Sequence, residues 1–406
     1  MFLRLYKHFA FPEDLHDRLR WLVRYPQDFL LVILMGVVTL YLGLQPFMWP
    51  QSHDILLYTR YAENFLRYHH FAPEYPPLAM GIFLVTQIYS RDPYLIFGIA
   101  MITAIVVVSR IALVVTSGRR VLVVVGYTML GMMRRHQWQW AYLILGVGAL
   151  VKLYPIFLMP IVLIEQWQML GDARVSTRIA TLGKALVPTI TFASVVMGVA
   201  WLMSPTTIWH FLSAASARPT QIEAVGGSII WLWASLHGAI PAIVHTYSSS
   251  NMAGSVSTAL ARGSVYFTLL GVGILYLRQY QHKTTAASTF LGVVGVIVLT
   301  SKVFSTQYLI WLLPLVGELV GLDIIWIAIC VLTSYDAMIY PFFSSIPPPF
   351  IRIEGFFFVV FLRNMLLVIA IVRVCSRHIA QGEEAQPSGV FRTTLLPRSS
   401  RIELSQ

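Results

Sequence analysis

The chain has 406 residues, of which 57% are hydrophobic and only 12% are charged, and its formal net charge is +11. A soluble chain is typically about 25% charged, because charged side chains must cover the surface that faces water. The composition therefore excludes a soluble globular enzyme, a disordered protein and a nucleic-acid-binding module. In a membrane protein, such a positive surplus usually marks the cytoplasmic loops. Two cysteines, Cys330 and Cys375, cannot form a disulfide framework or a four-ligand metal site.

Apolar runs along the chain predict an all-α, polytopic integral membrane protein with roughly 10–12 transmembrane helices. The first run, Phe29–Phe47, is long enough to cross a bilayer of about 30 Å, and we expect a retained helix rather than a signal peptide. Several later runs are shorter than the roughly 17 residues of a normal span, so tilted or partly re-entrant helices are expected. The further predicted spans are Leu78–Tyr89, Tyr94–Val115, Val121–Met133, Trp138–Lys152, Leu153–Glu165, Ala185–Met203, Ser264–Tyr280, Ala286–Thr300, Leu309–Val320, Ile324–Tyr340 and Ile353–Val374.

The distribution of Lys and Arg among the loops predicts the topology. Basic loops alternate with the less basic stretches 48–77, 204–263 and 342–352, and the positive-inside rule places these three outside and both termini in the cytoplasm. Arg119 and Arg120 disagree with this simple alternation. The predicted organisation is a cytoplasmic segment at 1–28, a membrane domain at 29–375 that carries an outer-face site, and a disordered cytoplasmic tail at 376–406. Ser228–Pro241 is expected to be an interfacial or re-entrant helix.

The first outer loop contains the most informative candidate residues. Spacings of three and four place Asp54, Tyr58 and Tyr61 on one face of a helix, where an acid and two aromatic rings could serve one site. An equally good interpretation makes Asp54 a first-turn acid that offsets the helix dipole. Glu74 and Tyr75 precede two prolines that suit the start of the next helix, and the simpler interpretation of Glu74 is an acid in a loop.

Isolated charges near the outer ends of predicted helices form a second group of candidates. A lysine in the membrane costs roughly 2.5–3.5 kcal/mol on insertion scales, which makes Lys152 and Lys302 functional candidates. Together they could bind a phosphate and position a base, whereas the alternative is that each lysine extends to the membrane interface.

Two further pairs of polar residues have both a functional and a structural interpretation. Arg218 and Glu223 could bind a sugar hydroxyl or phosphate, or they could pair with each other. Arg363-Asn364 could bind phosphate, but we favour a structural role in which the pair holds helices together through backbone carbonyls.

Several motifs of nucleotide and metal chemistry are missing from the sequence. It has no Walker loop, no Gly-x-Gly-x-x-Gly after a strand, no His-Glu-x-x-His and no cysteine cluster. It also has no Asp-x-Asp pair of the kind that holds the metal of a nucleotide sugar. These absences favour a donor without a nucleotide. We also expect no obligatory metal and no cofactor.

A set of short stretches, in order along roughly residues 29–375, carries a family resemblance. They are Asp54-Ile-Leu-Leu-Tyr58 with Tyr61-Ala62, Tyr75-Pro-Pro77, Lys152-Leu-Tyr-Pro155, Arg218-Pro-Thr-Gln-Ile-Glu223, the run from Lys302 to Pro314, Tyr340-Pro341 and Leu362-Arg-Asn364. On these residues the chain resembles the GT-C superfamily of membrane glycosyltransferases. More narrowly, it is similar to the bacterial polyprenyl-phosphate-mannose-dependent α-mannosyltransferase-like family.

This resemblance implies a GT-C-type fold in the cell membrane, with extracytoplasmic loops that carry the active site. The implied reaction is inverting transfer of a sugar, mannose in the family, from a polyprenyl-phosphate donor to a lipid or glycan acceptor, with membrane lipids and no nucleic acid as partners. The resemblance implies that Asp54 is the catalytic base and that Lys152, Lys302 and Arg218 bind the donor phosphate. The substrate-binding candidates are Tyr58, Tyr61, Glu74, Tyr75, Gln221, Glu223, Gln307 and Tyr308.

Two other classes of protein fit part of these observations. A multi-span transporter or flippase of lipid-linked sugars would also need many helices and charges within the membrane, and inverted repeats, which we do not find, would favour it. A non-catalytic relative is the third hypothesis, because the stretch from Val115 to Val121 is shorter than the family resemblance leads us to expect.

Overall fold

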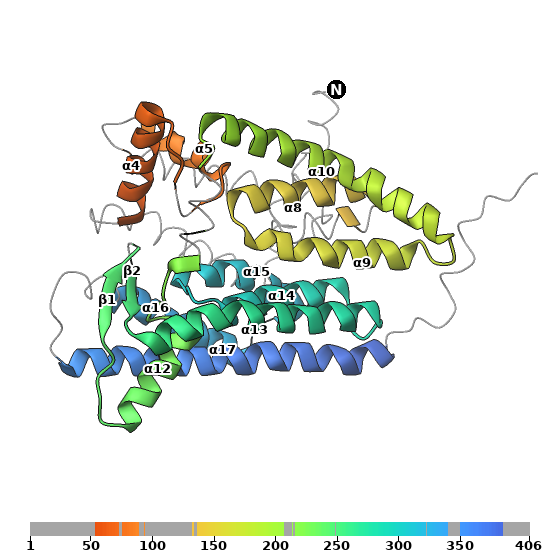
Figure 1. The fold of residues 1–406 in the computed structure, drawn as a ribbon. Coiled ribbons are helices and arrows are strands. Elements are labelled where there is room, and N and C mark those ends of the chain that lie inside the picture. Colours follow the sequence, from red (N-terminus) through yellow and green to blue (C-terminus); the bar gives the residue numbers. More distant parts are fainter. Residues whose placement is uncertain are drawn as a thin grey trace, which may run out of the picture.

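The computed structural model describes residues 53–72, 75–88, 93, 132–133, 136–206, 213, 216–247, 249–321, 323–339 and 350–384. This part of the chain is mostly helical, as the composition predicts (Figure 1). Its elements are α4 (His53–Tyr68), α5 (Ala79–Leu84), η2 (Val85–Gln87), α8 (Trp138–Val151), η3 (Tyr154–Leu158), α9 (Met159–Met169), α10 (Val175–Met203), α12 (Val225–Leu236), β1 (Ile243–Thr246), β2 (Ser249–Met252), α13 (Ser255–Tyr280), α14 (Ala286–Thr300), η4 (Thr306–Tyr308), α15 (Leu309–Leu319), α16 (Ile324–Ile339) and α17 (Phe350–Glu384).

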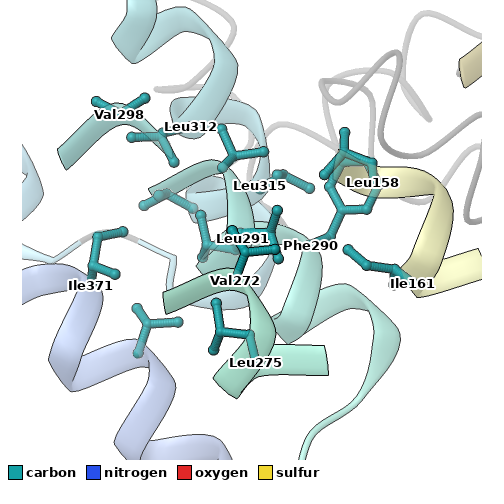
Figure 2. Close-up of a cluster of buried hydrophobic side chains, with 14 of the residues drawn as sticks. Leu158, Ile161, Val272, Leu275, Phe290, Leu291, Val298, Leu312, Leu315 and Ile371 are labelled. Carbon is teal, nitrogen blue, oxygen red and sulfur yellow. The ribbon is translucent and has the colours of Figure 1, made fainter. Parts of the chain in front are cut away.

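The helices form two neighbouring groups that share a hydrophobic core. In Figure 1, α8, α9 and α10 lie together above the group from α12 to α17. Helix α9 packs on both α13 and α14, and α14 also packs on α17. Figure 2 shows buried apolar side chains from both groups meeting, with Leu158 and Ile161 facing Phe290 and Leu291. Because these side chains come from segments far apart in the sequence, burying them joins the two groups.

Within the described part of the chain, three helices are long and apolar enough to cross a membrane: α10, α13 and the part of α17 from Gly355 to Ser376. Helices α10 and α13 also leave many large apolar side chains uncovered, such as Val199 and Leu202 on α10 and Phe267 and Leu270 on α13. A helix with an uncovered apolar face is suited to contact with lipid chains. Length, composition and exposure therefore agree on a helical protein whose membrane association is plausible.

The predicted bounds are accurate where one apolar run forms one helix. Helix α14 has the predicted bounds Ala286–Thr300, and α8 and α15 begin at the predicted residue and end one residue early. Helix α16 begins at the predicted residue and is described to Ile339. Thr285 caps α14, because its side-chain oxygen accepts a hydrogen bond of 3.3 Å from the backbone N–H of Ser288. Apolar periodicity and capping chemistry thus fix these helices locally.

Other predicted spans were wrong in length. The run Leu78–Tyr89 contains only the short α5 and η2 in its described part, and the run Leu153–Glu165 is divided into η3 and α9. Two prolines, Pro155 and Pro160, lie in the first turns of η3 and α9. Proline lacks a backbone N–H and is tolerated at these positions but not in a continuous helix, so the apolar run is divided there.

Helices α10, α13 and α17 extend beyond their predicted apolar runs. Helix α10 begins at Val175, ten residues before the predicted start, and includes Arg178 and Lys184 from the predicted basic loop. Helix α13 begins at Ser255 rather than Ser264, and α17 continues to Glu384, into the stretch 376–406 that we expected to be irregular. Lys and Arg have high helix propensity, so a charged residue ends an apolar run without ending the helix.

The hairpin β1–β2 is an addition to the predicted all-α fold. Its strands pair antiparallel, with Ile243 opposite Met252 and Thr246 opposite Ser249. The predicted interfacial segment Ser228–Pro241 contains most of helix α12, which buries one side, including Ser228 and Ile230, and exposes Trp233 and Leu236. The predicted spans Phe29–Phe47 and Tyr94–Val115, all but the end of Val121–Met133, and the stretch 115–121 with Arg119 and Arg120 lie outside the described residues.

Candidate functional site

The two lysines singled out in the sequence lie at helix ends on the same side of the molecule. Lys152 is the C-cap residue of α8, and Lys302 comes two residues after the end of α14. Both helices end at the left of Figure 1, where the hairpin, α4 and α5 also lie. The segments 216–224 and 301–308 at this end carry half of the candidate residues.

Arg218 and Lys302 form a pair of neighbouring cations. The guanidinium of Arg218 donates a hydrogen bond of 2.8 Å from Nη2 to Ser249 Oγ, and Lys302 Nζ donates one of 3.0 Å to the carbonyl oxygen of Ser216. Partial burial, together with the positive charge of Arg218, lowers the pKa of Lys302.

The positive charge of this pair is not neutralised by the described part of the chain. No described acidic side chain forms a salt bridge with Arg218 or Lys302. Arg218 Nε is also buried without a hydrogen-bond acceptor among the described residues. Two such cations favour an anion with several oxygens, such as phosphate, because charge-assisted hydrogen bonds are the stronger ones.

Backbone hydrogen bonds hold the two cation-bearing segments together. The N–H of Gln221 donates to the carbonyl oxygen of Lys302 at 2.8 Å. On the neighbouring residues, the N–H of Ile222 donates to the carbonyl oxygen of Ser250 at 3.2 Å, and the N–H of Met252 donates to the carbonyl oxygen of Thr220 at 2.8 Å. Strand β2 is therefore bonded to β1 on one edge and to residues 220–222 on the other, so the hairpin braces the segment that contains Arg218.

Lys152 and Tyr308 form a cation–π contact beside this pair. The ammonium of Lys152 lies 4.7 Å from the centre of the Tyr308 ring. Tyr308 belongs to η4, in the same segment as Lys302, so the contact connects the end of α8 with that segment. Lys152 is partly buried, and its ammonium is placed against an aromatic face that stabilises a positive charge.

The predicted aromatic residues of the first outer loop gather in one cluster. Tyr58 stacks on Phe83 at 4.5 Å between ring centres, and Tyr75 meets the same ring edge-on at 5.0 Å. Tyr61 lies 6.0 Å from Phe83 and 6.4 Å from Tyr75. Tyr58 and Tyr61 therefore share one face of α4, whereas the side chain of Asp54, the third residue predicted on that face, lies outside the described residues.

This aromatic cluster is attached next to Lys152. The N–H of Leu78, which directly follows the two prolines, donates a hydrogen bond of 3.2 Å to the carbonyl oxygen of Leu150. Leu150 lies two residues before Lys152 at the end of α8. The segment 53–88 and the cationic segments therefore belong to the same end of the molecule (Figure 1).

Glu223 lies in the protein core, with a side chain only 3% exposed. Gln221 Nε2 donates a hydrogen bond of 2.6 Å to Glu223 Oε2. The predicted alternative in which Glu223 pairs with Arg218 is wrong, because Arg218 donates to Ser249 and the cation near Glu223 is Arg363. The Glu223 side chain therefore contacts other side chains in the core and is not open to solvent, where a substrate would bind.

Arg363 and Asn364 have the structural role that we favoured. The Arg363 side chain is fully buried and forms a salt bridge with Asp336 of α16. Its Nη2 also donates a hydrogen bond of 2.6 Å to the backbone carbonyl of Glu223, and Asn364 Nδ2 donates to the same carbonyl at 3.2 Å. The two residues therefore bind α17 to α16 and to the segment before α12.

The structure leaves three of the predicted site residues without a described side chain. The side chains of Asp54 and Gln307, and the whole of Glu74, lie outside the described residues, although the backbone of Asp54 belongs to α4. The role of Asp54 as a base stays a prediction. Arg218 and Lys302 are brought together, Lys152 joins Tyr308, and the tyrosines of the first loop form their own cluster.

Sequence reasoning missed Asp336, Ser249 and Phe83. Asp336 offered a signal, because an acidic residue in an apolar run needs a partner, and Arg363 is a cation in another such run. Ser249 and Phe83 are ordinary residues in their local sequence. Only the pairing of distant segments gives them their contacts with Arg218 and with the tyrosines.

Among the described residues, no group of three or more His, Cys, Asp or Glu side chains is arranged to hold a metal ion. The arrangement that the structure offers is instead a pair of cations beside aromatic rings at one end of an apolar helical bundle. No protein-family model, curated protein or solved structure matches this chain.

Proposed function

We propose that this chain is a multi-pass protein of the cell membrane that transfers a sugar, mannose in the first instance, from a polyprenyl-phosphate donor to an extracytoplasmic acceptor. The observation that carries the proposal is the cation pair Arg218 and Lys302, which forms no salt bridge with a described acidic side chain and lies at the end of a bundle of apolar helices. A lipid phosphate has one charged group at the boundary of an apolar tail. It therefore requires cations at the end of an apolar structure.

The proposed reaction is a single displacement that inverts the anomeric carbon. A hydroxyl of the acceptor attacks that carbon, the bond from the carbon to the phosphate oxygen breaks, and polyprenyl phosphate leaves. Asp54 accepts the hydroxyl proton as general base. Arg218 and Lys302 stabilise the charge that gathers on the departing phosphate. This mechanism needs no covalent intermediate on the protein, in contrast to a retaining mechanism.

The direct test is transfer by the purified full chain in proteoliposomes that contain synthetic polyprenyl-phosphate-mannose and candidate lipid or glycan acceptors. Formation of polyprenyl phosphate and of a new glycosidic bond are both measured. We expect Asp54→Asn to abolish transfer while donor binding is kept. Full transfer by a well-folded Asp54→Asn protein would overturn the proposed base.

The cation pair is tested with a matched control. We expect Arg218→Met and Lys302→Met each to raise the KM for the donor by roughly tenfold to a hundredfold, because each removes a charge-assisted hydrogen bond worth about 1.5–3 kcal/mol. Lys283→Met removes a lysine from the loop between α13 and α14, at the other end of α14, and should leave the KM unchanged. An equal effect of all three changes would point to net charge rather than to a site.

The same vesicles distinguish the enzyme from a transporter. Movement of labelled polyprenyl-phosphate-mannose from one leaflet to the other without any new glycosidic bond would replace the proposed transfer with a flippase. A donor bound without movement or transfer would favour a non-catalytic relative.

A further inference from the structure

A buried cluster at the end of the segment that bears Arg218 contains two carboxyl groups and one cation. Glu223 precedes α12, Asp336 lies on α16 and Arg363 lies on α17. Their exposed fractions are 3%, 0% and 0%, so water does not solvate the charge of any of the three side chains. If both carboxyl groups were ionised, the cluster would carry one uncompensated negative charge in the core, which is strongly unfavourable.

The hydrogen bonds of the cluster leave one oxygen of Asp336 without a donor. Arg363 Nη1 pairs with Asp336 Oδ2, and Arg363 Nη2 donates to the backbone carbonyl of Glu223. The amide of Asn364 donates to that same carbonyl and, at 2.8 Å, to Ser228 Oγ. Asp336 Oδ1 is buried and accepts no hydrogen bond from the N–H and hydroxyl groups of the described residues.

The missing donor can come from the neighbouring carboxyl group. Glu223 lies within hydrogen-bonding reach of Asp336 through its side chain, and its Oε2 accepts from Gln221. Burial, and next the negative charge of Asp336, raise the pKa of Glu223 well above its usual range, against the opposing effect of Arg363. A neutral Glu223 has the O–H that Asp336 Oδ1 lacks.

We infer that Glu223 carries a proton and donates it in a hydrogen bond to Asp336 Oδ1, so that the core holds a proton-binding site. With Arg363 ionised and Asp336 as its counter-ion, the three side chains are then neutral in total. The site connects the segment that bears Arg218 to helices α16 and α17. A single proton thus neutralises the cluster and gives Asp336 Oδ1 a hydrogen-bond donor.

The groups that face Glu223 limit what else could hold this proton. Helix α16 contributes Asp336 and α17 contributes Arg363, and these are the charged groups that act on Glu223. Gln221 contributes a neutral amide, α12 contributes the hydroxyl of Ser228 to Asn364, and the segment 301–308 contributes the ring of Phe304, 4.1 Å from the Arg363 guanidinium. The proton therefore belongs to the carboxyl pair.

Infrared spectroscopy of the purified full chain tests the inference directly. A protonated carboxylic acid has a carbonyl-stretch band that a carboxylate lacks, and we expect this band at neutral pH. It should shift when the protein is made with glutamate labelled with ¹³C at the side-chain carboxyl, and it should be lost in Glu223→Gln. The control Glu165→Gln, on α9, should keep the band. A band that is absent, does not shift with the label, or survives in Glu223→Gln would overturn the inference.

Thermal unfolding gives a second measurement. A group whose pKa is raised by folding stabilises the folded state less as the pH rises from its unfolded value, about 4.3 for glutamate, towards the folded value. The melting temperature of the wild type relative to Glu223→Gln should therefore fall with rising pH over this range. A difference that rises, or stays constant, contradicts a protonated Glu223. If Glu223→Gln does not fold, a band in the wild type that does not shift with the label would still overturn the inference.

Discussion

Gly227 is the position at which a single methyl group should disturb the candidate site most clearly. It lies in the first turn of α12, directly behind the segment that carries Arg218 and Gln221. A Cβ atom at this position would lie 2.6 Å from the carbonyl oxygens of both Gln221 and Ile222. The close contacts between carbon and carbonyl oxygen that proteins do form have separations of about 3.3–3.6 Å, so the segment would have to retreat by roughly 0.7 Å.

The expected loss of stability for Gly227→Ala follows from two opposing contributions. Overpacking against a backbone that cannot rotate away costs about 1–3 kcal/mol. Alanine in place of glycine within a helix returns about 1 kcal/mol through helix propensity. The net destabilisation is therefore about 1 kcal/mol. The displacement of the segment should reduce sugar transfer more, by up to about a hundredfold, since that is the effect that a 1 Å misplacement can have.

The assay compares Gly227→Ala with Gly183→Ala. Gly183 lies inside α10 with nothing within 4 Å of its added Cβ, so the same change there should be neutral or stabilising. Tryptophan fluorescence during heating in detergent gives the melting temperature, and the proteoliposome assay gives transfer. If Gly227→Ala melts as high and transfers as fast as Gly183→Ala, the close approach between α12 and the Arg218 segment does not constrain the site.

Three further predictions concern the packing of α14, the charge of Lys302 and the contact of Lys152. Gly295→Ala should lower the melting temperature, because its Cβ would lie 2.8 Å from Cγ1 and 3.2 Å from Cγ2 of the buried Ile371. The control Gly273→Ala, whose Cβ would have nothing within 4 Å, should leave the melting temperature unchanged. Equal melting temperatures of the two variants would refute this prediction. Burial and the charge of Arg218 lower the pKa of Lys302, so the binding of inorganic phosphate, measured by calorimetry, should weaken as the pH rises through that lowered pKa. This loss of binding should occur at a lower pH than for an ordinary lysine, which has a pKa of about 10.4. Lys302→Met should remove this pH dependence. The contact between Lys152 and Tyr308 should give a coupling of about 0.5–1 kcal/mol in a double-mutant cycle of Lys152→Met and Tyr308→Leu, and additive effects on unfolding would contradict it.

The sequence predicts helices well where a run of apolar residues is both long and uninterrupted. Helix α14 is such a case, because its composition and its Thr285 cap act locally. The ends of α10 and α17 were harder to predict, because a helix continues through charged residues once its backbone hydrogen bonds are formed. The hairpin was missed because its strands are four residues each, and β2, which reads Ser-Ser-Asn-Met, is polar for a buried strand.

The sequence was sufficient to select candidate residues one by one, but not to predict how they pair. Scarcity of charge in an apolar chain was sufficient to select Lys152, Arg218 and Lys302. Whether Glu223 pairs with Arg218 or lies beside Arg363 depends on how α17 packs against the segment before α12, which no local pattern determines. The same tertiary packing assigns Asp336 to Arg363, so this buried ion pair becomes evident only from the fold.

The hydrogen bond from Gln221 N–H to the carbonyl oxygen of Lys302 also has a consequence for mutational tolerance. It joins the two cation-bearing segments through main-chain atoms, which every residue type except proline provides at the donor position. The approach of the two segments at this point is thus set by the backbone and not by the side chains of residues 221 and 302. A library that varies the exposed and half-buried positions of both segments, but keeps the two cations and excludes proline at 221, should retain many variants in which the two cations stay close together.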